Sequence, residues 1–256
     1  MSVKRLLPVA LLLLVAAAER VLRAAPLSSD PAHALCGVSM MHPLGCALSG
    51  ADLTSVLAYA VLRSAAIGIG CTVVCAAVGV ALALLFEASS ARATDLLRRS
   101  AELVQSVPGF LVALVLLATA RHPSAWTLSL ALCATGWAPF ARLAVARILS
   151  LRDQAFVQAA YALGLPGSRV MAHHLAPNLW PVVAVQSGAS ASAFVLTETS
   201  LSFLGIGPTD GLSMGALLDA GVTSMFIAPH MLPVAAVTMV FLNLSLLSLG
   251  KAFGRV

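Results

Sequence analysis

Gly211, Ser213 and Gly215 have the Gly-x-Ser-x-Gly spacing of a hydrolase nucleophile elbow. In that motif a strand leads into the serine and a helix leaves it, so the hydroxyl is presented on a sharp turn. No strand pattern precedes Ser213. We therefore expect a packed loop or a re-entrant segment here, and we retain a serine hydrolase as an alternative from another functional class.

Histidine side chains are common metal ligands, and two groups of them have suggestive positions. His173 and His174 are adjacent, so on a helix they point to different faces and cannot easily share one metal. We expect this pair to form a polar surface against another protein. His42, His122 and His230 all fall in segments that we expect on the outer side of a membrane. They would suit a path for metal ions, so a metal is retained as an alternative cargo.

Four of the five cysteines form two spaced pairs. Cys71 and Cys75 lie one helical turn apart in an apolar run, where cysteine usually behaves as a small hydrophobic residue, so we predict no metal there. Cys36 and Cys46 share one stretch outside the apolar runs. They could pair if that stretch faces an oxidising compartment, and we expect free thiols.

The amino-acid composition indicates whether these residues are surrounded by water or by lipid. Hydrophobic residues make up 60% of the 256 residues and charged residues only 10%, and the mean hydropathy is +0.97. The surface of a soluble domain needs about a quarter charged residues, so most of this chain faces lipid. The net charge of +5 does not indicate nucleic-acid binding, because the basic residues are scattered singly beside apolar runs.

Six apolar runs are long enough to cross a bilayer as helices of about 20 residues. They begin near Leu6, Leu57, Leu103, Trp126, Leu179 and Ile227. The first follows Lys4 and Arg5, and we expect an uncleaved anchor there, although a cleaved signal peptide is compatible with the pattern. On the second run, Gly68, Gly70 and Gly79 favour close helix crossings.

The basic residues predict how the chain is oriented in the membrane. With the N-terminus inside, eleven of them are cytoplasmic and four face outside, as the positive-inside rule requires. The eleven are Lys4, Arg5, Arg92, Arg98, Arg99, Arg142, Arg147, Arg152, Arg169, Lys251 and Arg255; the four are Arg20, Arg23, Arg63 and Arg121. Both termini and residues 158–178 are then cytoplasmic, and residues 26–53 and 205–226 lie outside.

Glu198 and Arg63 are charged residues in or at the edge of apolar runs. Glu198 would cost several kcal/mol at bilayer depth unless it faces protein or water, so we expect a helix-packing hydrogen bond to Thr197 or to a neighbouring helix. A direct contact with a transported substrate is the alternative. Arg63 opens a span, and we expect its side chain to reach toward the interface.

A polar segment broken by glycine and proline, residues 158–178, separates two of the apolar runs. Ala159, Ala160 and Ala162 would present a helical face that another protein can approach closely, and Gly164 can take the left-handed conformation that ends a helix. A second short helix would then stop before Pro177. Two short helices held by a glycine turn predict a rigid docking projection.

This segment resembles the "EAA" loop of permease subunits in binding-protein-dependent ABC importers. The resemblance extends from about His42 to Lys251 and is most similar to the second permease of the dipeptide, oligopeptide and nickel branch. It rests on motifs in a fixed order: residues 42–45 with Gly50 and Asp52; Arg99, Glu102 and Pro108; Gly136, Trp137, Ala141 and Arg142; residues 158–164 and 175–178; and residues 198–205.

The resemblance implies an all-α, multi-pass protein of the type I importer permease fold in the bacterial cytoplasmic membrane. Its partners would be a second permease, two cytoplasmic ATPases that bind ATP and Mg²⁺, and an external binding protein. It implies ATPase coupling at Gln158, Ala159, Ala160, Tyr161, Gly164, Leu165, Pro166, Arg169, His173, Pro177 and Asn178, a pathway or gate at Glu198, Thr197 and Ser200, and an external loop at His42, Gly45 and Asp52.

Some positions depart from the family pattern. Gln158 replaces the acidic residue that begins the loop, so coupling would depend on shape more than on charge. Cys46 and Ala47 replace a Thr-Asp pair, Ala51 replaces an arginine, and Met214 stands where tryptophan is common. These changes put the external loop's role in meeting the binding protein in question.

The predicted organisation is an anchor helix with an external segment over residues 1–56 and a permease core over residues 57–256, with the coupling loop at about residues 153–178. No Walker-type phosphate loop occurs in the sequence, so we expect a non-catalytic chain without its own cofactor or metal. Small peptides are the predicted cargo. Nickel or a metallophore is the alternative cargo, and a stand-alone channel is the alternative mechanism.

Overall fold

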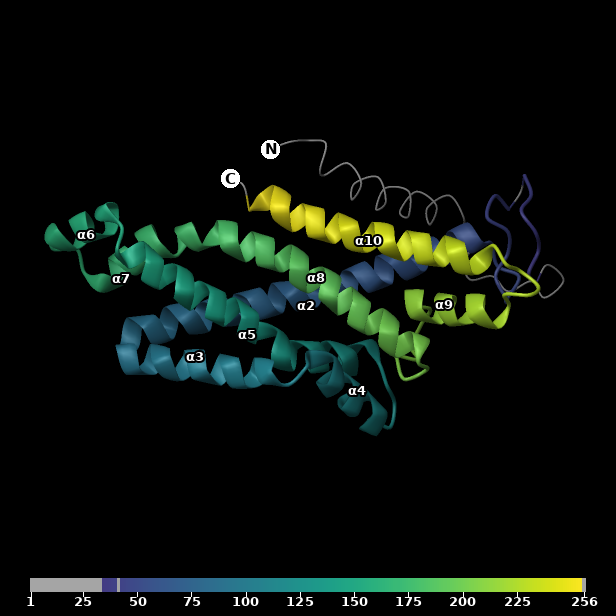
Figure 1. Ribbon diagram of the computed structural model, residues 1–256, viewed down its shortest axis with the longest axis horizontal. Coiled ribbons are helices and arrows are strands. Elements are labelled where there is room, and N and C mark those ends of the chain that lie inside the picture. Colours follow the sequence, from purple (N-terminus) through teal and green to yellow (C-terminus); the bar gives the residue numbers. More distant parts are fainter. Residues whose placement is uncertain (1–33, 41, 255–256) are drawn as a thin grey trace.

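The computed structural model describes residues 34–40 and 42–254, and all regular secondary structure in these residues is helical (Figure 1). The longer helices are α2 (Leu53–Ser89), α3 (Ala91–Ser106), α4 (Gly109–Thr119), α5 (Ala125–Arg152), α8 (Trp180–Phe203) and α10 (Met231–Phe253). The shorter elements are α6 (Ala155–Ala162), α7 (Gly167–Val170), the π-helix η3 (Met171–Leu175), the 3₁₀-helix η4 (Pro177–Leu179) and α9 (Met214–Thr223). The predicted all-α class is confirmed.

The described helices account for five of the six predicted spans. Four stretches are long and apolar enough to cross a membrane: Leu53–Ser89, Ala125–Arg152, Gly167–Phe203 and Met231–Phe253. A bent pair, Arg92–Ser106 with Gly109–Thr119, qualifies as a fifth. The first predicted span, near Leu6, lies outside the described residues.

The span predicted near Leu103 is not one straight helix. Its predicted start falls in the last turn of α3, and α3 and α4 meet at an angle of 67°. Pro108 lacks a backbone N–H and disfavours the helical conformation at the preceding residue, and Val107 is accordingly extended with φ −95° and ψ 124°. The break was not predicted because the apolar run continues past it, although Pro108 is a signal for a helix break.

Helix α2 is central, packing against α3, α5, α8, α9 and α10. Small residues permit two of these crossings: a Cβ on Gly79 would lie 2.6 Å from the Trp137 carbonyl oxygen of α5, and one on Gly68 would lie 2.6 Å from Val195 Cγ2 of α8. The predicted close approach is confirmed at Gly68 and Gly79 and is wrong at Gly70. Gly70, in contrast, faces open space, with no atom within 4 Å of its added Cβ.

The bundle has two distinct ends (Figure 1). At the α6 end, the ends of α2 and α5 and the start of α3 lie near α6 and α7. At the α9 end, the start of α2 and residues 42–52 lie near α9 and the start of α10, and Ala47, Leu53, Met214 and Met231 share one buried cluster there. Residues 26–53 and 205–226 were predicted to lie on one side of the membrane. Those of them that the structure describes lie at the same end of the bundle.

Candidate functional site

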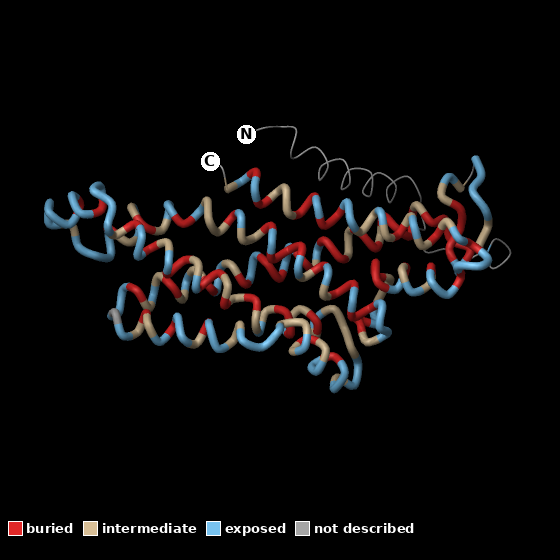
Figure 2. The backbone as a smooth tube through the Cα atoms, viewed as in Figure 1, coloured by how far each residue is buried: buried red, intermediate tan, exposed pale blue. Residues whose placement is uncertain are grey.

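Residues 153–179 form a compact projection at the α6 end (Figure 1). The chain leaves α5 at Arg152, forms α6, turns at Gly164, and passes through α7, η3 and η4 into α8. Most predicted coupling residues are exposed on it, and the segment is mainly pale blue in Figure 2. They are Gln158, Ala159, Tyr161, Gly164, Pro166, Arg169, His173, Pro177 and Asn178, with Leu165 half-buried.

The turn after α6 has a glycine in the left-handed region, as predicted, with φ +79° at Gly164. The Gly164 N–H donates to the Tyr161 carbonyl at 2.9 Å, and the Leu165 N–H donates to the Ala160 carbonyl at 3.2 Å. These are the two bonds of a Schellman motif, which satisfy the last carbonyls of a helix. The angle between α6 and α7 is therefore held by backbone hydrogen bonds.

The inner face of the projection is anchored in the bundle. Val157 and Ala160 are 0% and 5% exposed and join a buried cluster with Leu151 of α5 and Leu175 of η3. Residues three apart share a face of a helix, which places both on the inner side. The prediction that Ala160 faces a partner is therefore wrong, whereas Ala159 and Ala162 are exposed.

The outer face of the projection is polar and aromatic. Phe156, Tyr161 and Leu163 are 45%, 42% and 82% exposed. The Gln158 amide makes only a long 3.5 Å contact with the Asp153 carbonyl. This face thus presents apolar side chains and an amide with spare hydrogen-bonding capacity, a combination that suits docking to a protein.

The adjacent histidines of the projection have separate surroundings. His173 Nδ1 lies 3.2 Å from the Arg169 carbonyl, while the His174 ring stacks at a tilt on Phe156 with 6.4 Å between centroids. They form part of the projection's surface, as predicted, and do not belong to any cluster of metal-binding geometry among the described residues.

Glu198 joins two membrane-spanning helices. Its Oε2 accepts a hydrogen bond of 2.8 Å from Ser64 Oγ of α2, and its Oε1 accepts one of 3.3 Å from Ser202 Oγ. The helix-packing bond is thus to a neighbouring helix. The expected alternative partner, Thr197, donates to the Ala193 carbonyl instead, and Ser200 is exposed and donates to the Leu196 carbonyl.

The stretch before α2 is a cross-linked loop. Cys36 and Cys46 form a disulfide, so the expectation of free thiols is wrong. Asp52 caps α2 by accepting from the Thr54 N–H at 2.9 Å and holds His42 Nδ1 at 2.7 Å. The sulfur atoms near His42 are in the disulfide and cannot act as thiolate ligands.

Gly45 adopts a left-handed backbone with φ +82° in this loop. A Cβ there would lie 2.6 Å from His230 Nε2 at the start of α10. His42 and His230 thus come to the same end, but with His122 they do not form a metal cluster among the described residues.

Arg63 on α2 has a specific partner in the loop after α8, which was not predicted. Its guanidinium binds the Asp210 carboxylate and donates to the Gly211 carbonyl at 2.8 Å. Asp210 also accepts from the Ala125 N–H at 3.0 Å. The loop after α8 is thereby tied to α2 and to the start of α5, and the charge of Arg63 is paired.

Ser213 is a buried helix-capping residue. Its hydroxyl caps α9 by accepting from the Ala216 N–H at 3.1 Å, and the residue is 1% exposed. No strand precedes it, since residues 34–40 and 42–254 contain only an isolated bridge between Cys46 and Asp52. The nucleophile-elbow geometry is absent from this part of the chain.

Residues 76–255, which include the projection, match the family described as binding-protein-dependent transport system inner membrane component. The chain belongs to this family. The apolar helices and the family description together make it a multi-pass inner-membrane protein.

Permeases named for oligopeptide transport are among its relatives. The oligopeptide transport system permease protein OppC of Haemophilus influenzae is 30% identical over 192 residues, which cover 75% of this chain and 61% of the relative. OppC of Escherichia coli K12 is 29% identical over 192 residues, covering 75% and 63%, and OppC of Bacillus subtilis is 28% identical over 164 residues, covering 64% and 53%. The match thus spans about 60% of the length of the first two relatives.

One interhelical ion pair was not predicted from the sequence. Glu87 Oε1 on α2 lies 2.9 Å from Arg152 Nη1 on α5, and the Glu87 side chain is only 3% exposed. The signal was available, because Glu87, like Glu198, is a carboxylate in an apolar run. What the sequence could not supply was the partner, 65 positions away in the chain.

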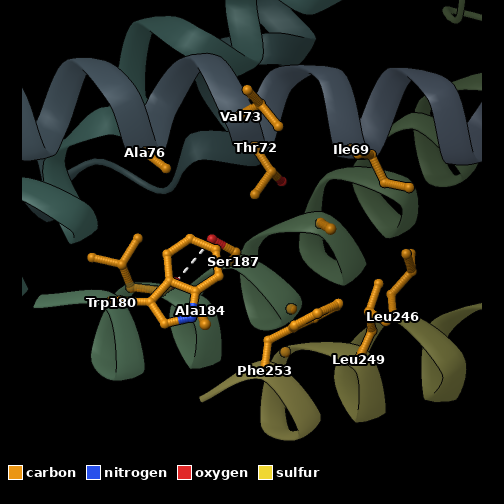
Figure 3. Close-up of a pocket in the computed structure, with 14 residues that line it drawn as sticks. Ile69, Thr72, Val73, Ala76, Trp180, Ala184, Ser187, Leu246, Leu249 and Phe253 are labelled. Carbon is orange, nitrogen blue, oxygen red and sulfur yellow. Dashed lines mark hydrogen bonds between the residues drawn. The ribbon is translucent and has the colours of Figure 1, made fainter. Parts of the chain in front are cut away.

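An apolar groove of about 340 Å³ opens between α2, α8 and α10 (Figure 3). The residues that line it include Ile69, Trp180, Leu246 and Phe253. The Ser187 hydroxyl donates a hydrogen bond to the Val183 carbonyl of its own helix. The groove therefore offers an apolar surface with little polar chemistry.

Proposed function

We propose that this chain is a non-catalytic permease subunit of an ATP-driven, binding-protein-dependent importer, and that the projection receives the motion of a cytoplasmic ATPase. The observation that carries this proposal is the combination of an exposed outer face and a buried inner face on one short, hydrogen-bonded segment within the family-matching region. ATP and Mg²⁺ would be bound by the ATPase partners.

The geometry provides a path for that motion. Val157 and Ala160 of the projection are packed in the cluster that contains Ala83 of α2 and Ile148 of α5. At the other side of the projection, η4 runs into α8 without an intervening loop. A displacement of the outer face would therefore move α5 and α8 together, because well-packed side chains transmit strain. Alternating access would follow from such rigid-body movement.

The proposed orientation places the α6 end in the cytoplasm, with both termini on that side. Arg92, Arg98, Arg99, Arg152 and Arg169 lie in the elements at the α6 end, in agreement with the positive-inside rule. The Cys36–Cys46 disulfide at the opposite end supports an oxidising compartment there.

The proposed cargo is small peptides, in line with the names of the relatives. The translocation path would be shared with a second permease, and an external binding protein would deliver the cargo at the α9 end. Exposed positions at this end include Leu48 and Ser49 before α2 and Ala216 and Asp219 on α9.

Site-specific cross-linking tests the proposal. Ala159→Cys on the projection and Val222→Cys at the α9 end are both exposed positions and give a matched pair. In membranes containing the complete importer, we expect Ala159→Cys to cross-link to an ATPase subunit and Val222→Cys not to do so. Cross-linking of the ATPase from position 222 alone would contradict both the orientation and the docking role.

A further inference from the structure

An interhelical ion pair lies directly before the projection. Glu87 is two residues from the end of α2, and Arg152 is the last residue of α5. Among the described residues, the other ion pairs at the α6 end, made by Asp95 and Glu102 with neighbouring arginines, lie within α3. The Glu87–Arg152 contact is thus the charged link between the helix that carries the projection and the central helix.

The link is only half made in this conformation. Glu87 Oε1 is paired with Arg152 Nη1, while Glu87 Oε2 and Arg152 Nε are buried and have no hydrogen-bond partner. One unpaired atom is an acceptor and the other is a donor, so the two atoms are complementary. A carboxylate and a guanidinium form their strongest contact when two parallel hydrogen bonds join them.

There is space beside the pair for such a rearrangement. A hollow of about 160 Å³ between α2, α3 and α5 is lined by Glu87, Thr94, Asp95, Arg98 and Arg152. Both Asp95 oxygens already accept from Arg98 and Arg99. The guanidinium of Arg152, whose side chain is 40% exposed, can therefore turn within the hollow toward Glu87 rather than toward Asp95.

We propose that Glu87 and Arg152 form a two-position latch, held by one hydrogen bond in this conformation and by two when the projection is displaced. The inference rests on the proposed function, since the displacement is that caused by the ATPase. Both are positioning residues, which connect the projection to α2 without touching cargo. Two discrete arrangements of one ion pair would favour two discrete positions of α2 relative to α5.

Arg152→Lys separates a two-position latch from a simple charged link. Lysine keeps the charge and one hydrogen bond but cannot make the paired bonds of a guanidinium. In proteoliposomes with the complete importer, we expect Arg152→Lys and Glu87→Gln each to lower cargo uptake per ATP hydrolysed by about tenfold. The double variant should be no worse than either single variant, because all three lose the same pair of parallel hydrogen bonds.

Glu102→Gln is the matched control, since Glu102 is 54% exposed on α3 and does not line the hollow. Its uptake per ATP should equal that of the unaltered chain. Full coupling in Arg152→Lys, or effects of the two single variants that multiply in the double variant, would overturn the latch.

The failure of the latch and the failure of the proposed function are distinguishable. If the unaltered importer shows no ATP-driven uptake, the proposed function is wrong and the latch falls with it. If it transports normally and the variants match it, only the latch is wrong. Thermal melting of the purified chain and of the same variants tests the ion pair without the rest of the importer. If the losses of stability in the two single variants add up in the double variant, the two residues are not directly coupled.

Discussion

Ser64 Oγ on α2 lies 2.8 Å from Glu198 Oε2 on α8, and Glu198 is 1% exposed. The carboxylate also accepts from Ser202 one turn along its own helix. An acidic residue in an apolar run is tolerated here because hydroxyl groups on two helices surround it. The contact fixes α2 against α8 in the half of the bundle nearer α9, away from the projection.

Replacing Glu198 tests that contact. Glu198→Ala leaves the hydroxyls of Ser64 and Ser202 without their acceptor and opens a cavity, so we expect a loss of about 2–4 kcal/mol in stability. Thermal melting of the purified chain measures it. Ser200→Ala, on the same helix but exposed, should change stability by less than about 0.5 kcal/mol. Equal melting of both variants would show that the buried contact does not stabilise the bundle.

Gly164 allows a test of the projection's turn. A Cβ there has no neighbour within 4 Å, so the cost of Gly164→Ala comes from the left-handed backbone and is about 1–2 kcal/mol. Gly164→Arg adds a large side chain to the docking face, and we expect ATP-driven uptake to be abolished while membrane insertion persists.

Gly167→Ala is the control for this turn, because its Cβ also meets open space and its φ is not positive. It should transport normally. Uptake assays in membranes with matched protein levels make the comparison, and normal transport by Gly164→Arg would count against a docking role for the turn.

The crossing of α8 and α10 depends on two glycines. A Cβ on Gly188 would lie 2.7 Å from Gly250 Cα and 2.8 Å from the Leu246 carbonyl oxygen. Gly188→Leu must separate the helices, and we expect a loss of about 1–3 kcal/mol. Gly70→Leu, which faces open space on α2, is the matched control. A lower melting temperature for Gly188→Leu alone would support the crossing; a decrease of equal size in both would contradict it.

The Cys36–Cys46 disulfide closes a short loop with a sequence separation of 10. Replacing both cysteines by serine should lower stability by about 2–3 kcal/mol, through the larger conformational freedom of the unfolded chain. Melting with and without reductant measures this effect. Reductant should destabilise the unaltered chain and leave the double-serine variant unchanged, whereas an equal response of the two proteins would rule out the disulfide as the cause.

Much of the architecture could be predicted from local sequence. The apolar runs beginning near Leu57, Trp126, Leu179 and Ile227 correspond to α2, α5, the stretch that contains α8, and α10, because lipid requires long apolar helices with satisfied backbones. The left-handed Gly164 was also predictable, since glycine adopts that conformation without steric cost. The break at Pro108 was hidden only by the length of the apolar run around it.

Partners distant in sequence could not be predicted. Arg63 had no predicted partner, and it binds Asp210, which is 147 positions away in the chain. Cys36 and Cys46 are close in sequence and were expected as free thiols, but whether they pair depends on the geometry of their loop. Ala160 was placed on the outer face of the projection and is buried. For Arg63 and Ala160, the side chains that surround the residue come from other helices and loops, which local sequence does not identify.

The amino-acid sequence by itself determined that this chain lies in lipid, that it is helical, that residues 158–178 interrupt the apolar runs, and which family it resembles. These properties depend on composition, period and local backbone chemistry. Only the tertiary structure decided which face of α6 is free, and that Glu87 meets Arg152 and Ser64 meets Glu198. Those contacts depend on how α2 crosses α5 and α8, and the crossing is set by packing at glycines and small residues that no single helix specifies.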